Sequence, residues 1–291
     1  MQQMEMKLYD FNVVLAFSWA TFGQNRRLMG DMRHVMRTKL NFLFLTAAIT
    51  LPAFCQDGDL LWQGKLAPGD LLKVQGVNGA IRATGGPGST ATITARKTGT
   101  KSDPAEVGFQ IVQFVGGVAI CPIYPDGNGK PPNACGMPGE DTYVSANNND
   151  VQVEFTLTVP QGVNLIAHTV LGNVDATSLT GDVDAASLTG DITVSTTGSV
   201  TARTLKGKVV VTMGSTASQG LKTIDTGEGN IDVTLPFDAN VRVQASAFRG
   251  RVSSDFPLAM SGNSFGGMLG KGTGPSLRLS TFEGDITVHQ Q

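Results

Sequence analysis

The 291-residue chain contains three histidines and three cysteines, and charged residues make up 16% of it. So few histidines leave little material for a metal or acid–base centre. Neither His168 nor His289 stands in the H-E-x-x-H spacing of zinc hydrolases. We therefore expect no catalytic residue, no cofactor-binding residue and no cofactor, and we predict that the protein is not an enzyme.

A concentrated positive charge is also missing. From Gln56 onward there are 16 basic and 21 acidic side chains, spread along the chain. Proteins that bind nucleic acid neutralise the phosphate backbone with clustered lysine and arginine. No such cluster is present, so nucleic acid is excluded as the expected partner.

No apolar run is long enough to cross a bilayer as a helix. Leu40–Ala53 follows the basic stretch Met36–Lys39, which is the order of a secretory signal peptide. We assign residues 36–55 to the signal and expect cleavage after Cys55, or alternatively lipidation of Cys55, although Phe54 is bulkier than a lipidation signal favours. Residues 1–35 are then a non-native upstream extension. An exported protein follows, periplasmic or at the cell surface, without a transmembrane span in the mature chain.

Cys121 and Cys135 are the two cysteines left after cleavage, and they enclose a loop rich in proline, glycine and asparagine. In an oxidising compartment this spacing predicts a disulfide, worth about 3 kcal/mol. A metal or redox pair is the alternative. The loop belongs to an insertion at about residues 101–150, and Tyr124 within it is the best candidate for an exposed contact with a partner.

A short phrase repeats from Val170 to Val211. Its glycines, spaced nine, nine, eight and nine residues apart, are Gly172, Gly181, Gly190, Gly198 and Gly207. Apolar residues alternate with polar ones after each glycine, as in a half-buried strand. We predict an all-β chain whose residues 56–291 form one parallel β-solenoid, of β-helix or β-roll type, with about nine residues per strand plus corner. Val174, Ile192 and Val209 should stack in one sheet, and Val183 and Val200 in the other.

Aspartates stand beside these corners, notably Asp182, Asp184 and Asp191. Short acidic side chains stabilise tight turns by accepting local backbone hydrogen bonds, and we expect that role here. Calcium binding, as in nonapeptide β-rolls, is a weaker alternative because lysines occupy equivalent positions further along. Asp182 and Asp184 could also serve as a glycosidase pair. The glycine-rich residues 259–274 are expected to form a loop.

Several motifs together resemble a known group. These are Val159-Pro160 and Leu235-Pro236 at strand ends, the Gly-Asp/Asn corners, and the closing T-x-x-G-D-I-x-V at Thr281–Val288. Over about residues 66–289 the chain resembles the bacterial exported putative-adhesin family of unknown function. The resemblance implies an adhesin-like parallel β-solenoid, displayed in the periplasm or on the surface, without established catalytic residues.

Three functions remain open at this point. The first is a non-enzymatic adhesion or envelope-interaction module with a protein or glycan partner. The second is an envelope stress or signalling accessory that binds a partner through the cystine loop. The third is a polysaccharide-active β-helix enzyme.

Intact mass spectrometry of the exported protein tests the signal assignment. We expect a chain that begins at Gln56, because the apolar run and the small-x-small site direct cleavage there. An acylated N-terminal cysteine would contradict cleavage after Cys55 and identify a lipoprotein.

Overall fold

The computed structural model describes residues 58–125, 135, 146, 148–217, 222–271 and 273–291, all within the compact unit Ala53–Gln291. The predicted extension (1–35) and signal (36–55) lie outside the described residues, as does most of the cystine loop. The described part is all-β, with a single 3-10 turn, η1 (Pro104–Glu106), as its helical element. Within those ranges no helix is long and apolar enough to cross a membrane.

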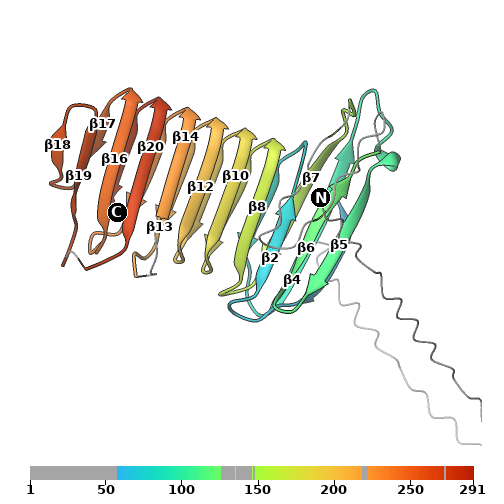
Figure 1. The fold of residues 1–291 in the computed structure, drawn as a ribbon. Coiled ribbons are helices and arrows are strands. Elements are labelled where there is room, and N and C mark those ends of the chain that lie inside the picture. The colour runs from blue at the N-terminus through green and yellow to red at the C-terminus, as the bar shows by residue number, and fades with distance from the viewer. Residues whose placement is uncertain (1–57, 126–134, 136–145, 147, 218–221, 272) are drawn as a thin grey trace, which may run out of the picture. The chain divides into compact units, whose positions relative to one another are not determined.

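The strands form two large, mostly parallel sheets (Figure 1). The ten-stranded sheet has the spatial order β1 (Asp59–Lys65), β4 (Thr90–Thr98), β7 (Gln152–Val159), β3 (Ile81–Gly85), β9 (Val174–Leu179), β11 (Ile192–Thr196), β13 (Val209–Met213), β15 (Ile231–Leu235), β21 (Ile286–Gln290), β17 (Val252–Ser254). The eleven-stranded sheet has the order β18 (Ala259–Ser261), β19 (Ser264–Met268), β16 (Arg242–Arg249), β20 (Ser276–Glu283), β14 (Lys222–Glu228), β12 (Val200–Lys206), β10 (Val183–Thr189), β8 (Asn164–Leu171), β2 (Leu71–Gln75), β6 (Gly117–Ile123), β5 (Gly108–Phe114). Both sheets are open, since each ends in edge strands.

From β8 to β15, consecutive strands alternate between the two sheets. In the ten-stranded sheet Val174 pairs with Ile192, and Ile192 with Val209. In the eleven-stranded sheet Val183 pairs with Val200. The predicted assignment of these five residues to two columns is confirmed. Beyond Val209 the spacing lengthens, because its next partner is Ile231 and the one after that is Ile286.

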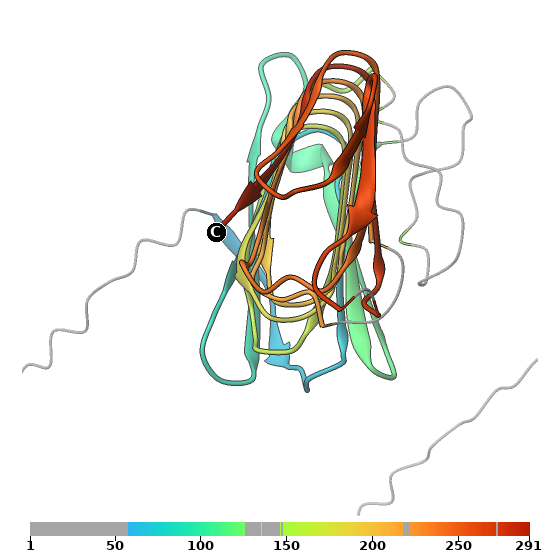
Figure 2. The ribbon, with the colours of Figure 1, turned by 90° about the vertical axis from the view of Figure 1, so that its left-hand side faces the viewer.

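The two sheets face each other as opposing walls, which Figure 2 shows along the stack. Side chains alternate between buried and half-exposed along most strands, for example along β11 and β13. The buried set is rich in valine, isoleucine, leucine and alanine, and it forms one continuous core. Each large aliphatic side chain removed from water stabilises the fold by about 1.5–3 kcal/mol.

A column of glycines stacks at one corner between the sheets. Gly172, Gly190, Gly207 and Gly229 have φ angles from 147° to 156°, which disfavour other residues. A Cβ atom placed on Gly207 would lie 2.1 Å from the carbonyl oxygen of Gly190, and one on Gly229 would lie 1.9 Å from that of Gly207. The corners therefore approach each other closely, and a side chain at any of them would collide with the neighbouring backbone.

Buried hydroxyl groups hold the carbonyl groups of this glycine column. Ser187 donates to the Gly172 carbonyl at 2.9 Å, Thr204 to that of Gly190 at 3.0 Å, and Thr226 to that of Gly207 at 3.0 Å. Thr169 and Thr281 make the equivalent bonds to Gly79 and Gly229. Each bond pairs a buried hydroxyl with a buried carbonyl. Neither group is therefore left unpaired in the core, where an unpaired polar group is costly.

The corner aspartates and asparagines form a second ladder. The Asn173 side chain accepts the Asp191 amide at 2.9 Å, and the Asp191 side chain accepts the Lys208 amide at 2.7 Å. Asn164, Asp182 and the Ser199 amide repeat this pattern at the other corner. We predicted that these side chains accept backbone amides of their own turn, and this is wrong. Each side chain accepts an amide of the corner that lies 17 or 18 residues further along. These residues link neighbouring corners.

The chain doubles back at both ends of the stack. β20 lies between β14 and β16, and β21 between β15 and β17, so the last strands of the chain occupy interior positions. At the other end β2 lies between β6 and β8, and β3 lies between β7 and β9. The strands next to these inserted ones pair parallel to them, and β17 ends its sheet in this way. At the other three edges the outermost pairing is antiparallel, for example between β5 and β6.

Two segments expected to be loops contain strands. Within the insertion at 101–150, β5 and β6 form a hairpin that extends the eleven-stranded sheet. Residues 259–274 contain the hairpin of β18 and β19. In both, cross-strand pairing to a distant part of the sheet outweighs local glycine and proline content.

Replacing Gly207 with alanine tests the glycine column. We expect Gly207→Ala to lower the free energy of unfolding by more than about 2 kcal/mol, because the new methyl group meets the Gly190 carbonyl and φ is unfavourable. Gly108→Ala is the control, because open space surrounds that position. Thermal or denaturant unfolding measures both. Equal stability of the two variants would contradict the role of the column.

Candidate interaction surface

A row of exposed apolar side chains follows one margin of the eleven-stranded sheet. It comprises Leu188 on β10, Leu205 on β12, Phe282 on β20 and Phe248 on β16, between 48% and 65% exposed. The strand order places them on neighbouring strands, with Gly227 of β14 between Leu205 and Phe282. At about 4.8 Å per strand the row is about 19 Å long. We call these four side chains the apolar row.

The gap at Gly227 is partly covered. A Cβ atom placed on Gly227 would lie 2.9 Å from the Leu205 Cδ1 atom, so the leucine side chain leans over the glycine. Beyond it, the Phe248 and Phe282 rings stack with centroids 4.9 Å apart and planes 12° from parallel. The Arg249 guanidinium lies 5.3 Å from the centre of the Phe282 ring. The row is thus continuous and ends in an aromatic pair with a cation beside it.

Local sequence explains why these side chains point outward. Each follows the last inward residue of its strand: Ser187, Thr204, Thr281 and Ala247 are all buried. Because successive side chains in a strand alternate between faces, the next residue faces solvent. The same outward position is leucine or phenylalanine on four strands. These side chains are not buried by any other part of the described chain. Such a contiguous patch is typical of an interaction surface.

Charged residues flank the row on the corner side. Lys206 and Glu228 form an ion pair at 3.0 Å, and Arg249 pairs in register with Glu283. These exposed charges contribute little to stability. They surround the apolar row with a polar rim, which is the usual composition of a protein interface.

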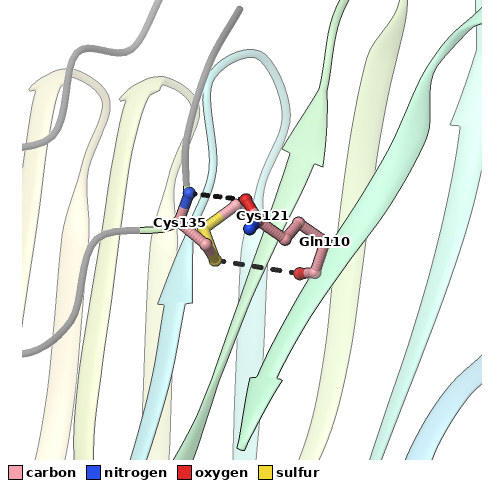
Figure 3. Close-up of a disulfide and its surroundings, with 3 residues drawn as sticks. All are labelled: Gln110, Cys121 and Cys135. Atoms are coloured by element: carbon pink, nitrogen blue, oxygen red, sulfur yellow. Dashed lines mark hydrogen bonds between the residues drawn. A yellow bond between two sulfur atoms is a disulfide. The ribbon is translucent and has the colours of Figure 1, made fainter. Parts of the chain in front are cut away.

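The structure contains the predicted disulfide between Cys121 and Cys135 (Figure 3). Cys121 lies in β6, and the Cys135 amide donates to the side-chain oxygen of Gln110 in β5 at 3.0 Å. The bond and this contact fix Cys135 against the outer face of the β5–β6 hairpin. Residues 126–134 and 136–145 lie outside the described residues.

Asp150 fastens the other end of the insertion. Its carboxylate accepts the Thr100 hydroxyl and the backbone amides of Thr100, Lys101 and Ser102, at 2.5 to 3.2 Å. These bonds, led by the one from the Thr100 hydroxyl, hold the pKa of Asp150 well below its usual range. Residues 100–102 and Asp150 are thereby joined where the insertion leaves the sheet and returns to it.

Tyr124 is not an exposed contact. Its side chain is 1% exposed, and its hydroxyl donates to the Val151 carbonyl at 2.9 Å. Burial raises its pKa to about 12, against a smaller opposing effect from the Asn78 backbone. The prediction of a partner contact here is wrong, because the ring fills the core next to the start of β7.

The three aspartates weighed as calcium ligands or as a glycosidase pair have different partners. Asp182 and Asp191 bind backbone amides at corners, whereas Asp184 lies in β10 with its carboxylate 3.2 Å from the His168 ring. Burial raises the pKa of Asp184, but His168 and Arg203 outweigh it, so the pKa is lowered overall. Among the described residues no group of three or more histidine, cysteine, aspartate or glutamate side chains is placed to hold a metal.

A Gly-x-Ser-x-Gly sequence occurs at Gly262–Gly266. In hydrolases this motif forms a strand-to-helix turn that exposes the serine beside a histidine. Here it lies in the β18–β19 hairpin, and the Ser264 hydroxyl donates to the Ser261 carbonyl at 2.8 Å. The serine therefore supports a turn.

The apolar row is not among the features that the sequence predicts. The signal was present as the recurring order of a small or hydroxyl residue, a large apolar residue, one variable residue and glycine. It occurs in SLTG at 187–190, TLKG, TFEG and AFRG, but SLTG also occurs at 178–181, where Leu179 is buried. Only the strand order shows that TFEG and AFRG are neighbours and that the two rings stack.

Comparisons with known proteins place the chain near two solved structures. A putative cell adhesion protein from Clostridium sporogenes is 16% identical, with a TM-score of 0.48, covering 79% of this chain and 98% of that one. A putative adhesin from Bacteroides fragilis is 12% identical, with a TM-score of 0.26, covering 80% and 97%. No family model and no curated protein sequence matches the chain.

Tyr124→Phe tests the buried phenol. We expect a loss of about 1 kcal/mol in the free energy of unfolding at pH 7, because the Val151 carbonyl loses a hydrogen bond. The raised pKa favours the neutral phenol in the folded state. The contribution of Tyr124 to the free energy of unfolding is therefore fully present below pH 10 and is lost as the pH rises towards 12. The variant should lack that fall. An unchanged decline from pH 10 to 12 would show that another group causes it.

Proposed function

We propose that this protein is a non-enzymatic, exported β-solenoid that acts as an adhesin-like interaction module at the cell envelope. The alternation of strands from β8 to β15 supports the solenoid interpretation, with about nine residues per strand and corner from β8 to β13. A disulfide between Cys121 and Cys135 supports an oxidising compartment, periplasmic or extracellular.

The apolar row is the observation that carries this proposal. Its rigid backing of parallel strands presents four side chains in a fixed line, so little conformational entropy is lost on binding. Aromatic residues and arginine are the side chains most often responsible for binding energy at protein interfaces. The pair of Phe248 and Phe282 beside Arg249 would then be the centre of contact. A protein or a glycan of the envelope is the proposed partner, and the apolar chemistry favours a protein surface.

The two other hypotheses have less support. For a partner-binding cystine loop, Tyr124 was the residue of interest, and it is buried. For a polysaccharide-active enzyme, Asp182 and Asp184 were the expected pair, and Asp182 already accepts the Ser199 amide.

The double variant Phe248→Ser/Phe282→Ser tests the apolar row. The purified protein is bound to envelope extract of the source bacterium, with quantitative pull-down, and to a glycan array. We expect a partner whose capture falls at least tenfold in the double variant, because the aromatic contact is removed. Phe237→Ser is the matched control, since Phe237 is also exposed but lies outside the row.

Two results would contradict the proposal. One is capture that is equal in the double variant and the wild-type protein. The other is release of reducing sugar from a polysaccharide that Asp182→Ala or Asp184→Ala abolishes, which would identify an enzyme.

A further inference from the structure

The two sheets end in four edge strands, and three of them are protected against pairing with another chain. β17 and β18 have three residues each. β1 has a bulge between Leu60 and Trp62 and charged residues, Asp59 and Lys65, at its ends. Short length, bulges and charges are the usual protections of an edge.

β5 lacks all of these protections. It has seven residues, Gly108–Phe114, without charge, proline or a recorded bulge. Val115-Gly116 is a two-residue hairpin loop, so Phe114 and Gly117 form a hydrogen-bonded pair and the pairs alternate from there. The backbone groups of Phe109, Ile111 and Gln113 therefore face away from β6. Among the described residues none donates to or accepts from the backbone of these three residues, and the nearest bond on this side is that from the Lys97 ammonium to the Val107 carbonyl at 2.8 Å, just before β5.

The opposite sheet extends one strand further at this end. Beyond the interior strands β3 and β2, the ten-stranded sheet continues with β7, β4 and β1, whereas the eleven-stranded sheet continues with β6 and β5 only. The place beside β5 and opposite β1 is therefore a position for one strand. A second copy that paired through its own β5 would bring its β4 to the position that β1 occupies. The arrangement admits a single strand and blocks a second copy.

Trp62 marks the inner side of this position. It pairs with the buried Ile93 of β4, so its side chain lies on the inward face of β1. A Cβ atom placed on Gly64 would lie 2.3 Å from the indole, which shows that the ring covers that glycine. Trp62 is half-buried against the core and its other side is open. A strand added to β5 would cover the ring.

We propose that the outer edge of β5 is a binding site for one extended, uncharged segment of a partner protein, which joins the eleven-stranded sheet by β-strand addition. The partner backbone would bond to Phe109, Ile111 and Gln113, and its inward side chains would pack on Trp62. β5 itself has no charged side chain, and the one cation at its start, the Lys97 ammonium 5.6 Å from the centre of the Phe109 ring, already donates to the Val107 carbonyl, which favours an uncharged segment. This site is separate from the apolar row and does not depend on it.

Trp62 fluorescence gives a direct assay. The full chain with Trp19→Phe leaves Trp62 as its single tryptophan. The probe is a synthetic peptide that copies Gly108–Phe114 with a lysine at each end, and it can pair antiparallel with Ile111 opposite its own isoleucine. We expect saturable binding with a blue shift of Trp62 emission. The same peptide with Ile111→Pro should not bind, because proline cannot donate to the ladder.

Variants of the edge make the test specific. Gln113→Pro removes an outward amide while the pairing with β6 uses other residues, and Ile111→Lys places a charge on the edge. Each should weaken peptide binding at least tenfold. If one of the two variants does not fold, the other still tests the proposal. Val115→Lys at the exposed hairpin tip is the control and should bind as the parent does.

Three results would overturn the proposal. The first is absence of any shift in Trp62 emission. The second is equal binding by the edge variants and the parent. The third is a dimer, seen by analytical ultracentrifugation, that Gln113→Pro dissociates, because this would make a second copy the occupant. Peptide binding that persists in Phe248→Ser/Phe282→Ser would separate this site from the apolar row.

Discussion

The close stacking of glycine corners is the constraint on which the rest of the structure depends. Gly172, Gly190, Gly207 and Gly229 stand so near each other that a Cβ atom would touch the next carbonyl. This contact brings successive strands to hydrogen-bonding distance in both sheets. The hydroxyl ladder from Thr204 and its equivalents then pairs the buried carbonyl groups, so close approach does not leave polar groups unsatisfied.

The same corner geometry creates the surface that can bind a partner. Because these strands end in register, the residue after the last inward side chain of each strand falls on one line. Leucine and phenylalanine at that position form the apolar row beside the glycine column, with Lys206, Glu228 and Arg249 around it. A rigid array with one repeated outward position needs no cleft to present an extended contact.

The ends of the array face a different problem, since a parallel sheet leaves unpaired backbone groups at each edge. The chain places its first and last repeat strands inside the stack and covers them with further parallel strands, which are followed by antiparallel strands at three of the four edges. The edge strands β17 and β18 are short, and a bulge interrupts the edge strand β1. The hairpin of β5 and β6, held by the disulfide and by Asp150, leaves one uncharged edge beside Trp62. The offset of β1 makes that edge accessible to a strand but not to a sheet.

The regular part of the fold can be predicted from local sequence alone. The alternation after each glycine predicted the columns of Val174, Ile192 and Val209 and of Val183 and Val200, because a two-residue period and a glycine corner are local properties. It also predicted the disulfide. Four features could not be predicted in this way: Ile286 lies beside Ile231, Tyr124 is buried, residues 259–268 form a hairpin, and Phe248 stacks on Phe282. These are contacts between distant segments, and a local pattern does not record which distant strand will be the neighbour.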